Sequence, residues 1–169
     1  MKLHIGGLQA KEGWKILNIM AAENVDYIGD LTDLSQFPND SVDEIYASHV
    51  LEHISHKQID STLDGIYRIL KVSGKLYISV PDMDRLFRMY LDPNTTSQMR
   101  FFMMCVIFGG QNDAYDFHYF GWSEDLLSDA LIRHQFKDIE RVEQFGFFDD
   151  TSSMRIGEMA ISLNLTATK

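Results

Sequence analysis

The 169-residue sequence is poor in cysteine, in basic residues and in long apolar runs. Cys105 is the only cysteine, so the chain can form no internal disulfide, which is typical of a protein of the reducing cytoplasm. Its 15 basic residues are outnumbered by 25 acidic ones, which gives a formal net charge of -10. A surface of that charge repels phosphate backbones and anionic lipids, and no basic run offsets it. We therefore expect no nucleic-acid partner and no membrane partner.

Two further absences bear on location. The longest apolar run, Phe101 to Phe108, is far shorter than the ~18 residues that a membrane-spanning helix needs. The opening residues, MKLHIGG, lack the long apolar core of a signal peptide. With 169 residues, 45% of them hydrophobic, the chain is expected to form one soluble, cytoplasmic domain spanning residues 1–169.

What the sequence does contain is an ordered series of strand and helix patterns. Alternation and short apolar runs predict strands at 2–5, 15–19, 25–29, 43–47, 75–80, 139–145 and 159–166. Helical spacing predicts one helix capped by Ser55, a second capped by Asp82 and a third beginning at Ser123. Strand, helix and strand in this order indicate a parallel sheet, to which the last two strands could add an antiparallel edge.

The first two predicted strands are joined too briefly for a helix. Only eight residues, 7–14, separate them, whereas a parallel crossover normally takes a dozen or more. Gly6, Gly7 and Gly13 do not form the G-x-G-x-x-G pattern of a phosphate-binding loop. We therefore expect the first helices to be shortened or missing, and a simple glycine turn is an equally good interpretation.

The stretch VDEIYASHVLEH, residues 42–53, changes from strand-like alternation to a helix-like pattern where polar side chains cluster. Ser48, His49, Glu52 and His53 follow the predicted strand directly. In open α/β sheets, ligands bind beyond the carboxyl ends of the strands. These side chains therefore lie where a functional site is expected.

A second unusual region lies in the last third of the chain. The segment from Thr96 to Phe108 is rich in methionine, which predicts a buried core or subunit-contact helix and leaves a ligand-covering role open. The loop 109–122 follows, with fourteen residues of mixed glycine, acidic and aromatic character. Loops of that length in compact domains are often functional. His118, beside Asp116 and Tyr119, is its best candidate for chemistry.

These segments resemble one family. LHIGG, the Gly13-Trp14 turn, VDEIYASHVLEH, YRILKVSGKLYISVPD and DAYDFHYFGW together resemble the class I S-adenosylmethionine-dependent methyltransferases, in particular a small type 11-like group. The resemblance covers nearly the whole chain. It implies a Rossmann-like α/β fold, mostly parallel with a C-terminal antiparallel hairpin, and S-adenosylmethionine as cofactor. Acidic charge and abundant aromatics favour a small-molecule or saccharide acceptor.

The resemblance also implies the residues that bind the cofactor. Gly6 and Gly7 match the glycine turn that passes under the methionine part of the cofactor. Asn18 stands where the family usually has an acidic residue that binds the ribose, and an amide there bonds a hydroxyl more weakly. Asp30 by its side chain and Leu31 by its main chain match the positions beside adenine.

Catalysis in such an enzyme is mainly placement of a nucleophile in line with the methyl group, with a base where the nucleophile is protonated. Ser48 and His49 match the loop after the fourth strand, near the transferable methyl group. His118 is the first candidate for the base and His49 the second. His4, within a strand, is assigned a structural role.

Three departures from the family leave a second interpretation open. The glycine motif reads Gly6-Gly7-Leu8, the first helix is missing, and the usual Pro-Gly turn is replaced by Val72-Ser73-Gly74. A degenerate member that binds the cofactor poorly, or has lost the reaction, would show the same features.

A third interpretation comes from residues 49–53, which spell H-x-x-E-H, the signature of inverted zinc metalloproteases. His49 and His53 would then be ligands and Glu52 the base. The pattern offers little more than one helical turn and no evident third ligand. We therefore expect no metal.

Overall fold

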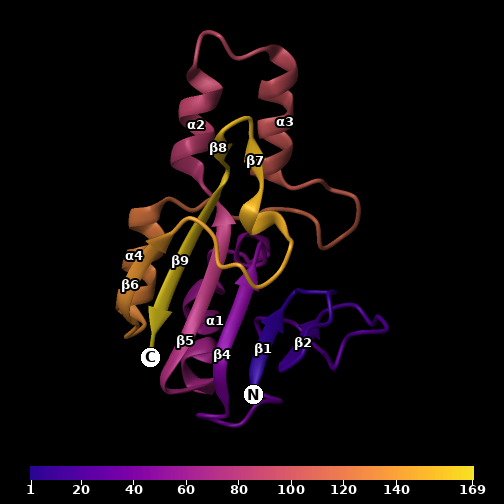
Figure 1. The fold of residues 1–169 in the computed structure, drawn as a ribbon, viewed down its shortest axis with the longest axis vertical. Helices are drawn as coiled ribbons and strands as arrows, with labels where there is room; N and C mark the ends of the chain where they lie inside the picture. Colours follow the sequence, from indigo (N-terminus) through magenta and orange to yellow (C-terminus); the bar gives the residue numbers. More distant parts are fainter.

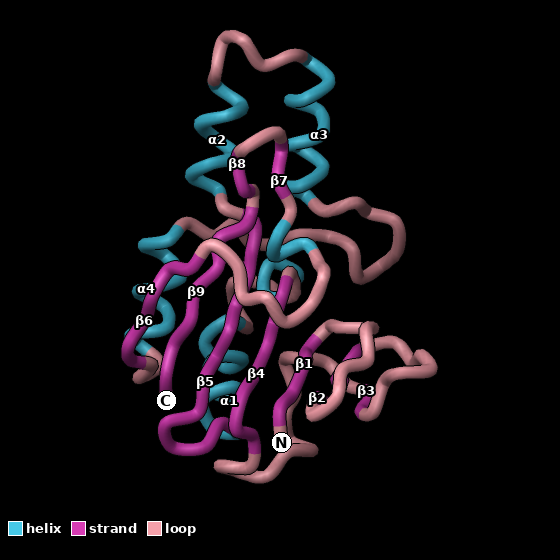
Figure 2. Tube along the Cα trace, in the orientation of Figure 1, coloured by secondary structure: helices cyan, strands magenta, loops and turns pink.

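The computed structural model covers residues 1–169 and is built on a seven-stranded sheet (Figure 1, Figure 2). Its strands are β1 (Lys2–Ile5), β2 (Trp14–Asn18), β3 (Tyr27–Ile28), β4 (Val42–Ser48), β5 (Leu70–Pro81), β6 (Lys137–Val142) and β9 (Ser162–Thr168). They are ordered β3-β2-β1-β4-β5-β9-β6. The pairs among β1 to β5 are parallel, whereas β9 is antiparallel to both neighbours. The predicted fold class, a mostly parallel Rossmann-like sheet with an antiparallel C-terminal pair, is confirmed.

Two helices cover one face of this sheet. The helices of the chain are α1 (Ile59–Ile69), α2 (Met83–Leu91), α3 (Ser97–Phe108) and α4 (Glu124–Arg133). Figure 1 shows α1 and α4 behind the sheet. The largest apolar cluster lies between them and the strands and includes Ile45, Ala47, Leu63, Ile66, Leu127 and Leu131. Because side chains alternate along a strand, Ile45 and Ala47 point into this core while Tyr46 points to the opposite face.

The opposite face has no helix in the first half of the chain. Neither the β1–β2 nor the β2–β3 connection is helical, as predicted. Instead, the segment between β6 and the hairpin β7 (Arg155–Ile156) and β8 (Met159–Ala160) crosses that face (Figure 1). Its Phe145, Phe147 and Phe148 pack on Trp14 of β2 and Tyr46 of β4. Aromatic side chains from late in the chain therefore take the place of the missing helices.

Helices α2 and α3 project together beyond the sheet (Figure 1, Figure 2). Within α3 only Met103 is buried, and Phe101 is 73% exposed. The prediction of a buried core helix is therefore wrong for most of α3, and a subunit-contact role stays a prediction. None of the helices combines the length and the apolar character needed to span a membrane.

The predicted helix caps have different outcomes. Asp82 caps α2 as expected, because its Oδ1 accepts a hydrogen bond of 3.0 Å from the Arg85 backbone N–H. The Ser55 cap is wrong: α1 begins at Ile59, its N-cap is Gln58, and no side chain caps it. The carbonyl of Ser55 accepts the Gln58 N–H in a turn that precedes the helix. The serine therefore belongs to this turn and not to the first turn of α1.

Candidate functional site

A cavity of about 530 Å³ opens beyond the carboxyl ends of the parallel strands. Its wall is formed by residues that follow β1, β2, β3 and β4, and by the loop 109–122, which contributes Tyr115, Asp116 and Tyr119. Of the predicted site residues, the wall includes Gly6, Asn18, Asp30, Leu31 and His49. Gly7, Ser48 and His118 are not part of it. The location is the one where open α/β sheets bind their ligands.

Gly6 forms the tight turn at the end of β1. Its φ is 79°, and its N–H donates to the Leu17 carbonyl at 2.8 Å. A Cβ at this position would overlap with Val50 Cγ1. Glycine is therefore required both by the backbone conformation and by the close approach of Val50, another wall residue. Gly7 serves packing instead, since a Cβ there would overlap with the His4 ring.

The amide of Asn18 is engaged by the chain's own backbone. Its Nδ2 donates to the carbonyls of Gly6 and Gly7, each at 3.1 Å, and its Oδ1 accepts the Met20 N–H at 2.9 Å. The residue is 8% exposed. Asn18 therefore fixes the glycine turn at the cavity wall, and only one lone pair of Oδ1 is left for a ligand.

Asp30 and Leu31 lie on the wall after β3. One Asp30 oxygen, Oδ1, accepts the Thr32 N–H at 2.8 Å, so the carboxylate is held by its own turn while the residue stays exposed. Leu31 is buried. Ser48, predicted near the methyl group, has a buried Oγ without a hydrogen-bond partner and does not reach the cavity.

His49 has an unusual backbone conformation for a non-glycine residue, with φ 53°. Its Nε2 lies 2.9 Å from Ser162 Oγ, and that hydroxyl donates its only proton to the Thr151 carbonyl at 2.8 Å. Nε2 must therefore carry a proton and donate to Ser162. The other ring nitrogen, Nδ1, lies 3.1 Å from Oε1 of Glu52, where a lone pair would face a carboxylate.

Both ring nitrogens of His49 are therefore engaged by contacts within the protein, Nε2 with Ser162 and Nδ1 with Glu52. The geometry therefore favours a positioning role for His49 over the predicted role as a base. Its strained backbone fits such a role, because strain of this kind is retained where neighbouring contacts fix it.

Glu52, in the short helix η1 (Leu51–His53), is fully buried. Burial raises the pKa of its carboxyl, but the neighbouring His49, His53 and His118 more than offset this, and the pKa lies below its ordinary value. Neither carboxylate oxygen has a hydrogen-bond partner. A buried carboxylate among three imidazoles is a strongly polar centre directly behind the cavity wall.

The loop 109–122 folds against this centre. The Glu52 carbonyl accepts the N–H groups of Tyr119 at 2.8 Å and Phe120 at 3.3 Å. His53 Nδ1 lies 3.1 Å from the Phe117 carbonyl, and the rings of His53 and His118 meet edge to face with centroids 4.6 Å apart. These contacts hold the loop against the short helix, and both contribute residues to the cavity wall.

His118 lies against His53, which is one of two imidazoles on the cavity wall. Burial lowers the pKa of His118, and Glu52 only partly opposes this, so the ring is neutral at neutral pH. A neutral ring can accept a proton. However, His118 itself does not line the cavity. The sequence placed His53 among the side chains of the expected site, but its contact with His118 could not be predicted, because that contact depends on a distant loop of the chain.

The H-x-x-E-H interpretation is changed by the structure. His49 is turned toward Ser162 and Glu52, whereas Glu52, His53 and His118 each offer one ligand atom within 4.8 Å of the others. The two histidines of the motif therefore do not form one pair of ligands. His118, from the distant loop, joins Glu52 and His53 instead.

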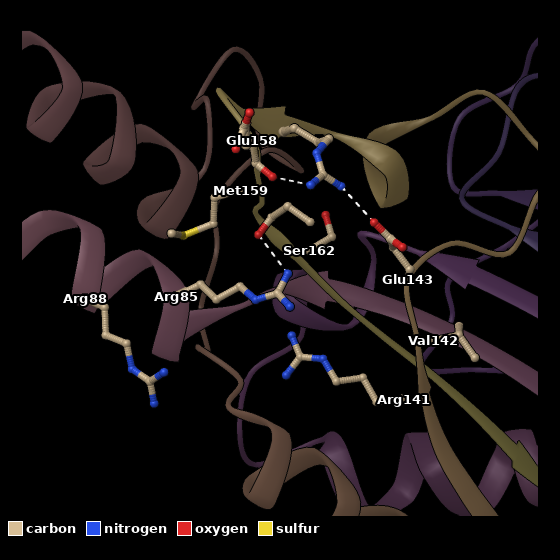
Figure 3. A pocket seen from close by; sticks show the side chains of 10 residues that line it. Arg85, Arg88, Arg141, Val142, Glu143, Glu158, Met159 and Ser162 are labelled. Carbon is tan, nitrogen blue, oxygen red and sulfur yellow. Dashed lines mark hydrogen bonds and ion pairs between the residues drawn. The ribbon is translucent and has the colours of Figure 1, made fainter.

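A second cavity, of about 690 Å³, lies at the same edge of the sheet beside β6 and the β7–β8 hairpin. Figure 3 shows Arg85 and Arg141 extending into it from α2 and β6. Both pair with the buried Asp82, at 3.3 and 2.5 Å, and Arg155 pairs with Glu143 at 3.1 Å. Most of the positive charge is therefore neutralised, and the network mainly ties β6 and the hairpin to α2.

The fold and the cavity define a class of protein: an open, mostly parallel α/β sheet with a ligand site beyond its carboxyl edge. Residues 11–78 match the family model described as "Methyltransferase domain". No curated protein matches the sequence. The match covers less than half of the chain; together with the fold, it agrees with the predicted resemblance to the class I S-adenosylmethionine-dependent methyltransferases.

Solved structures with this fold are distant in sequence. A SAM-dependent methyltransferase from Archaeoglobus fulgidus is 15% identical, with a TM-score of 0.62 over 99% of this chain and 85% of that one. A SAM-dependent methyltransferase from Methanosarcina mazei is 16% identical, with a TM-score of 0.58 over 99% and 91%. The Burkholderia thailandensis 1,6-didemethyltoxoflavin-N1-methyltransferase, solved with its substrate and S-adenosylhomocysteine, is 16% identical, with a TM-score of 0.61 over 99% and 70%.

Proposed function

We propose that the protein transfers the methyl group of S-adenosylmethionine to a small-molecule or saccharide acceptor in the cytoplasm. The observation that carries this proposal is the cavity at the carboxyl edge, whose wall combines the Gly6 turn with Asp30, Leu31 and the loop 109–122. The family match and the fold support the cofactor. The single cysteine, Cys105, is free, which suits a reducing compartment.

The residues present fit this cofactor in the first half of the chain. The Gly6 turn leaves no room for a side chain, so a ligand can approach the backbone closely there. Asp30 retains a free carboxylate oxygen for a hydroxyl or amino group, and Leu31 presents an apolar wall to an adenine ring. We assign the methionine part to Gly6 and the adenine to Asp30 and Leu31. Asn18 supports the turn and adds one acceptor.

The acceptor side is assigned to the loop 109–122. Tyr115, Asp116 and Tyr119 reach the cavity from this loop, and His53 reaches it from η1. An acceptor placed against them would attack the methyl carbon, a new bond would form to that carbon, and the electron pair of the C–S bond would pass to sulfur. The acceptor's proton would pass to the His53–His118 pair, in which the lowered pKa of His118 provides a neutral ring.

Binding of S-adenosylhomocysteine to the purified protein tests the proposal. At ligand one hundred times its dissociation constant, the free energy of unfolding should rise by about 2.7 kcal/mol, measured as a shift in Tm. Gly6→Ala should abolish the shift, because the added Cβ meets Val50 and distorts the turn.

Gly13→Ala is the matched control. Gly13 also has a positive φ, 82°, but a Cβ there meets nothing within 4 Å, so the variant should still bind. No Tm shift and no calorimetric heat with the wild-type protein at millimolar ligand would favour the degenerate-member interpretation.

A further inference from the structure

The side chains of Glu52, His53 and His118 form a cluster, of which the methyltransferase proposal uses only the two histidines. Each offers one ligand atom, and these atoms lie within 4.8 Å of one another. Glu52 and His53 come from η1, whereas His118 comes from the loop 109–122. Two imidazoles and one carboxylate are the donor set of many zinc and non-haem iron sites.

The strongest evidence for a metal site is the buried carboxylate of Glu52. It is 0% exposed, and neither of its oxygens has a hydrogen-bond partner. Burying an ionised group costs several kcal/mol unless charges and hydrogen bonds compensate it. The ion pair with His49, at 3.1 Å, compensates part of the cost of burying this charge, but the contact involves Oε1 alone. Oε2 remains without a partner.

The two histidines are also prepared to donate lone pairs. The Nδ1 of His53 lies 3.1 Å from the Phe117 carbonyl, so this nitrogen carries the proton and Nε2 keeps its lone pair. The Nδ1 of His118 is buried and has no hydrogen-bond partner. A histidine held by a backbone carbonyl through one nitrogen is the usual arrangement of a metal ligand, because the bond fixes the tautomer and the ring orientation.

We propose that Glu52, His53 and His118 bind one divalent transition-metal ion. Three protein ligands leave at least one coordination position open, as in catalytic zinc sites. His53 lies on the wall of the cavity, so the open position faces the acceptor side. His49, which pairs with Glu52, orients this ligand from outside the metal's coordination shell.

The function of the ion rests on the proposed methyltransferase activity. A cation at this position would bind the hydroxyl of an acceptor and lower its pKa, so that the proton passes to water. The resulting oxygen anion attacks the methyl carbon, and the C–S electron pair passes to sulfur. His53 and His118 would then act as ligands and not as the proton acceptor. Because the cation binds a hydroxyl group, the substrate class is an alcohol or phenol.

Metal titration of protein freed of metal with a chelator tests the site directly. Zn²⁺ and Co²⁺, each added alone, should bind with one ion per chain in calorimetry, and Co²⁺ should give the visible absorption of a four- or five-coordinate ion. Glu52→Gln, which keeps the size of the side chain, should weaken binding by roughly 100-fold or more. His53→Ala, at a partly exposed position, provides a second test if Glu52→Gln fails to fold.

His134→Ala is the matched control. His134 forms the other cluster of histidine with carboxylates, at 2.8 Å from Asp64 and 3.1 Å from Asp60 on the surface. Its loss should leave the affinity unchanged. Absence of one-to-one binding, or binding that survives both Glu52→Gln and His53→Ala, would overturn the metal site.

S-adenosylhomocysteine binding to the metal-free protein separates the two proposals. A protein that binds S-adenosylhomocysteine but no metal keeps the methyltransferase proposal and loses the metal site. A protein that binds the metal but not S-adenosylhomocysteine keeps the metal site and loses its assigned function.

Discussion

At Asn18 a single amide closes three hydrogen bonds to the backbone around the glycine turn. The family resemblance suggests that an acidic residue here would bind the ribose more strongly. The structure shows a cost, because a carboxylate cannot donate to the carbonyls of Gly6 and Gly7 and would face both with negative charge. The residue type at position 18 must therefore be considered together with the hydrogen bonds that its side chain already makes.

Asn18→Asp should for this reason destabilise the protein and fail to tighten cofactor binding. Two donated hydrogen bonds are lost in a buried setting, so we expect a loss of about 2 to 4 kcal/mol in the free energy of unfolding. Denaturant unfolding and S-adenosylhomocysteine calorimetry measure the two effects. Asn24→Asp is the control, since Asn24 makes one exposed bond of 3.3 Å to Leu8. Tighter binding in Asn18→Asp would show that ribose recognition dominates.

His4 provides a prediction about pH. Burial lowers its pKa from 6.5 to about 4, with only a small opposing effect of Asp150. The folded state therefore disfavours the protonated ring, and the unfolded chain binds the proton first as the pH falls. Stability should decrease between pH 6.5 and 4, by on the order of 3 kcal/mol, and this contribution is fully present above pH 6.5.

The pH dependence of the free energy of unfolding checks this assignment. His4→Gln should reduce its slope between pH 6.5 and 4, whereas His56→Gln, at an exposed position, should not. An unchanged slope in His4→Gln would mean that other groups, such as the carboxylates, cause the loss of stability in acid.

At the scale of elements, Asp82 joins α2 to β6. Its carboxylate caps α2 and forms an ion pair with Arg141 of β6, and the residue is 1% exposed. Asp82→Asn keeps an acceptor for the cap but leaves Arg141 and Arg85 without their shared anion. We expect a loss of roughly 3 to 5 kcal/mol in unfolding experiments.

Asp84→Asn is the matched control for this change. Asp84 also lies in the first turn of α2, is exposed and forms no ion pair, so its loss should change stability by about 0.5 kcal/mol or less. Equal effects of the two substitutions would indicate that the helix dipole, and not the buried ion pairs, determines the role of Asp82.

The elements themselves could largely be predicted from the sequence, since strand alternation and helix periodicity are local signals. The strand at Lys2–Ile5 was predicted with its observed bounds, and the Asp82 cap was confirmed. The Ser55 cap was wrong because the serine belongs to a turn that ends at Gln58, and α1 begins only after this turn. The local sequence signal does not distinguish a turn that precedes a helix from the first turn of the helix itself.

The site was predictable only in part. The residues after β1, β3 and β4 could be placed at one edge, because parallel strands share that edge. The cluster of Glu52 with His118 could not, because it depends on hydrogen bonds between the Glu52 carbonyl and Tyr119, more than 60 residues later. The role of Asn18 could not be predicted either, because its partners are backbone carbonyls of a turn whose shape the sequence does not determine.

At the scale of the whole molecule, a segment near the C-terminal end of the chain packs against the first strands. Phe148 lies against His4, with ring centroids 4.0 Å apart, and against Trp14 at 5.5 Å. The Tyr46 hydroxyl of the same face donates to Asp150 Oδ2 at 2.8 Å. His4 in turn underlies Gly7 in the glycine turn. The segment that replaces the missing helices therefore also holds the cofactor side of the cavity.

Phe148→Ala should accordingly affect both stability and ligand binding. Removing a buried phenylalanine costs about 3 kcal/mol or more, and the loss here falls on the layer beneath the glycine turn. We expect a lower Tm and a weaker affinity for S-adenosylhomocysteine, measured at a temperature where the variant remains folded.

Phe101→Ala, on α3 at 73% exposure, is the matched control and should change neither property appreciably. A Phe148→Ala protein that loses stability but binds S-adenosylhomocysteine with wild-type affinity would show that the aromatic layer supports the sheet without shaping the turn. Since the covering segment is connected to His49 through the Thr151 carbonyl and the Ser162 hydroxyl, such a result would limit its influence to the acceptor side of the cavity.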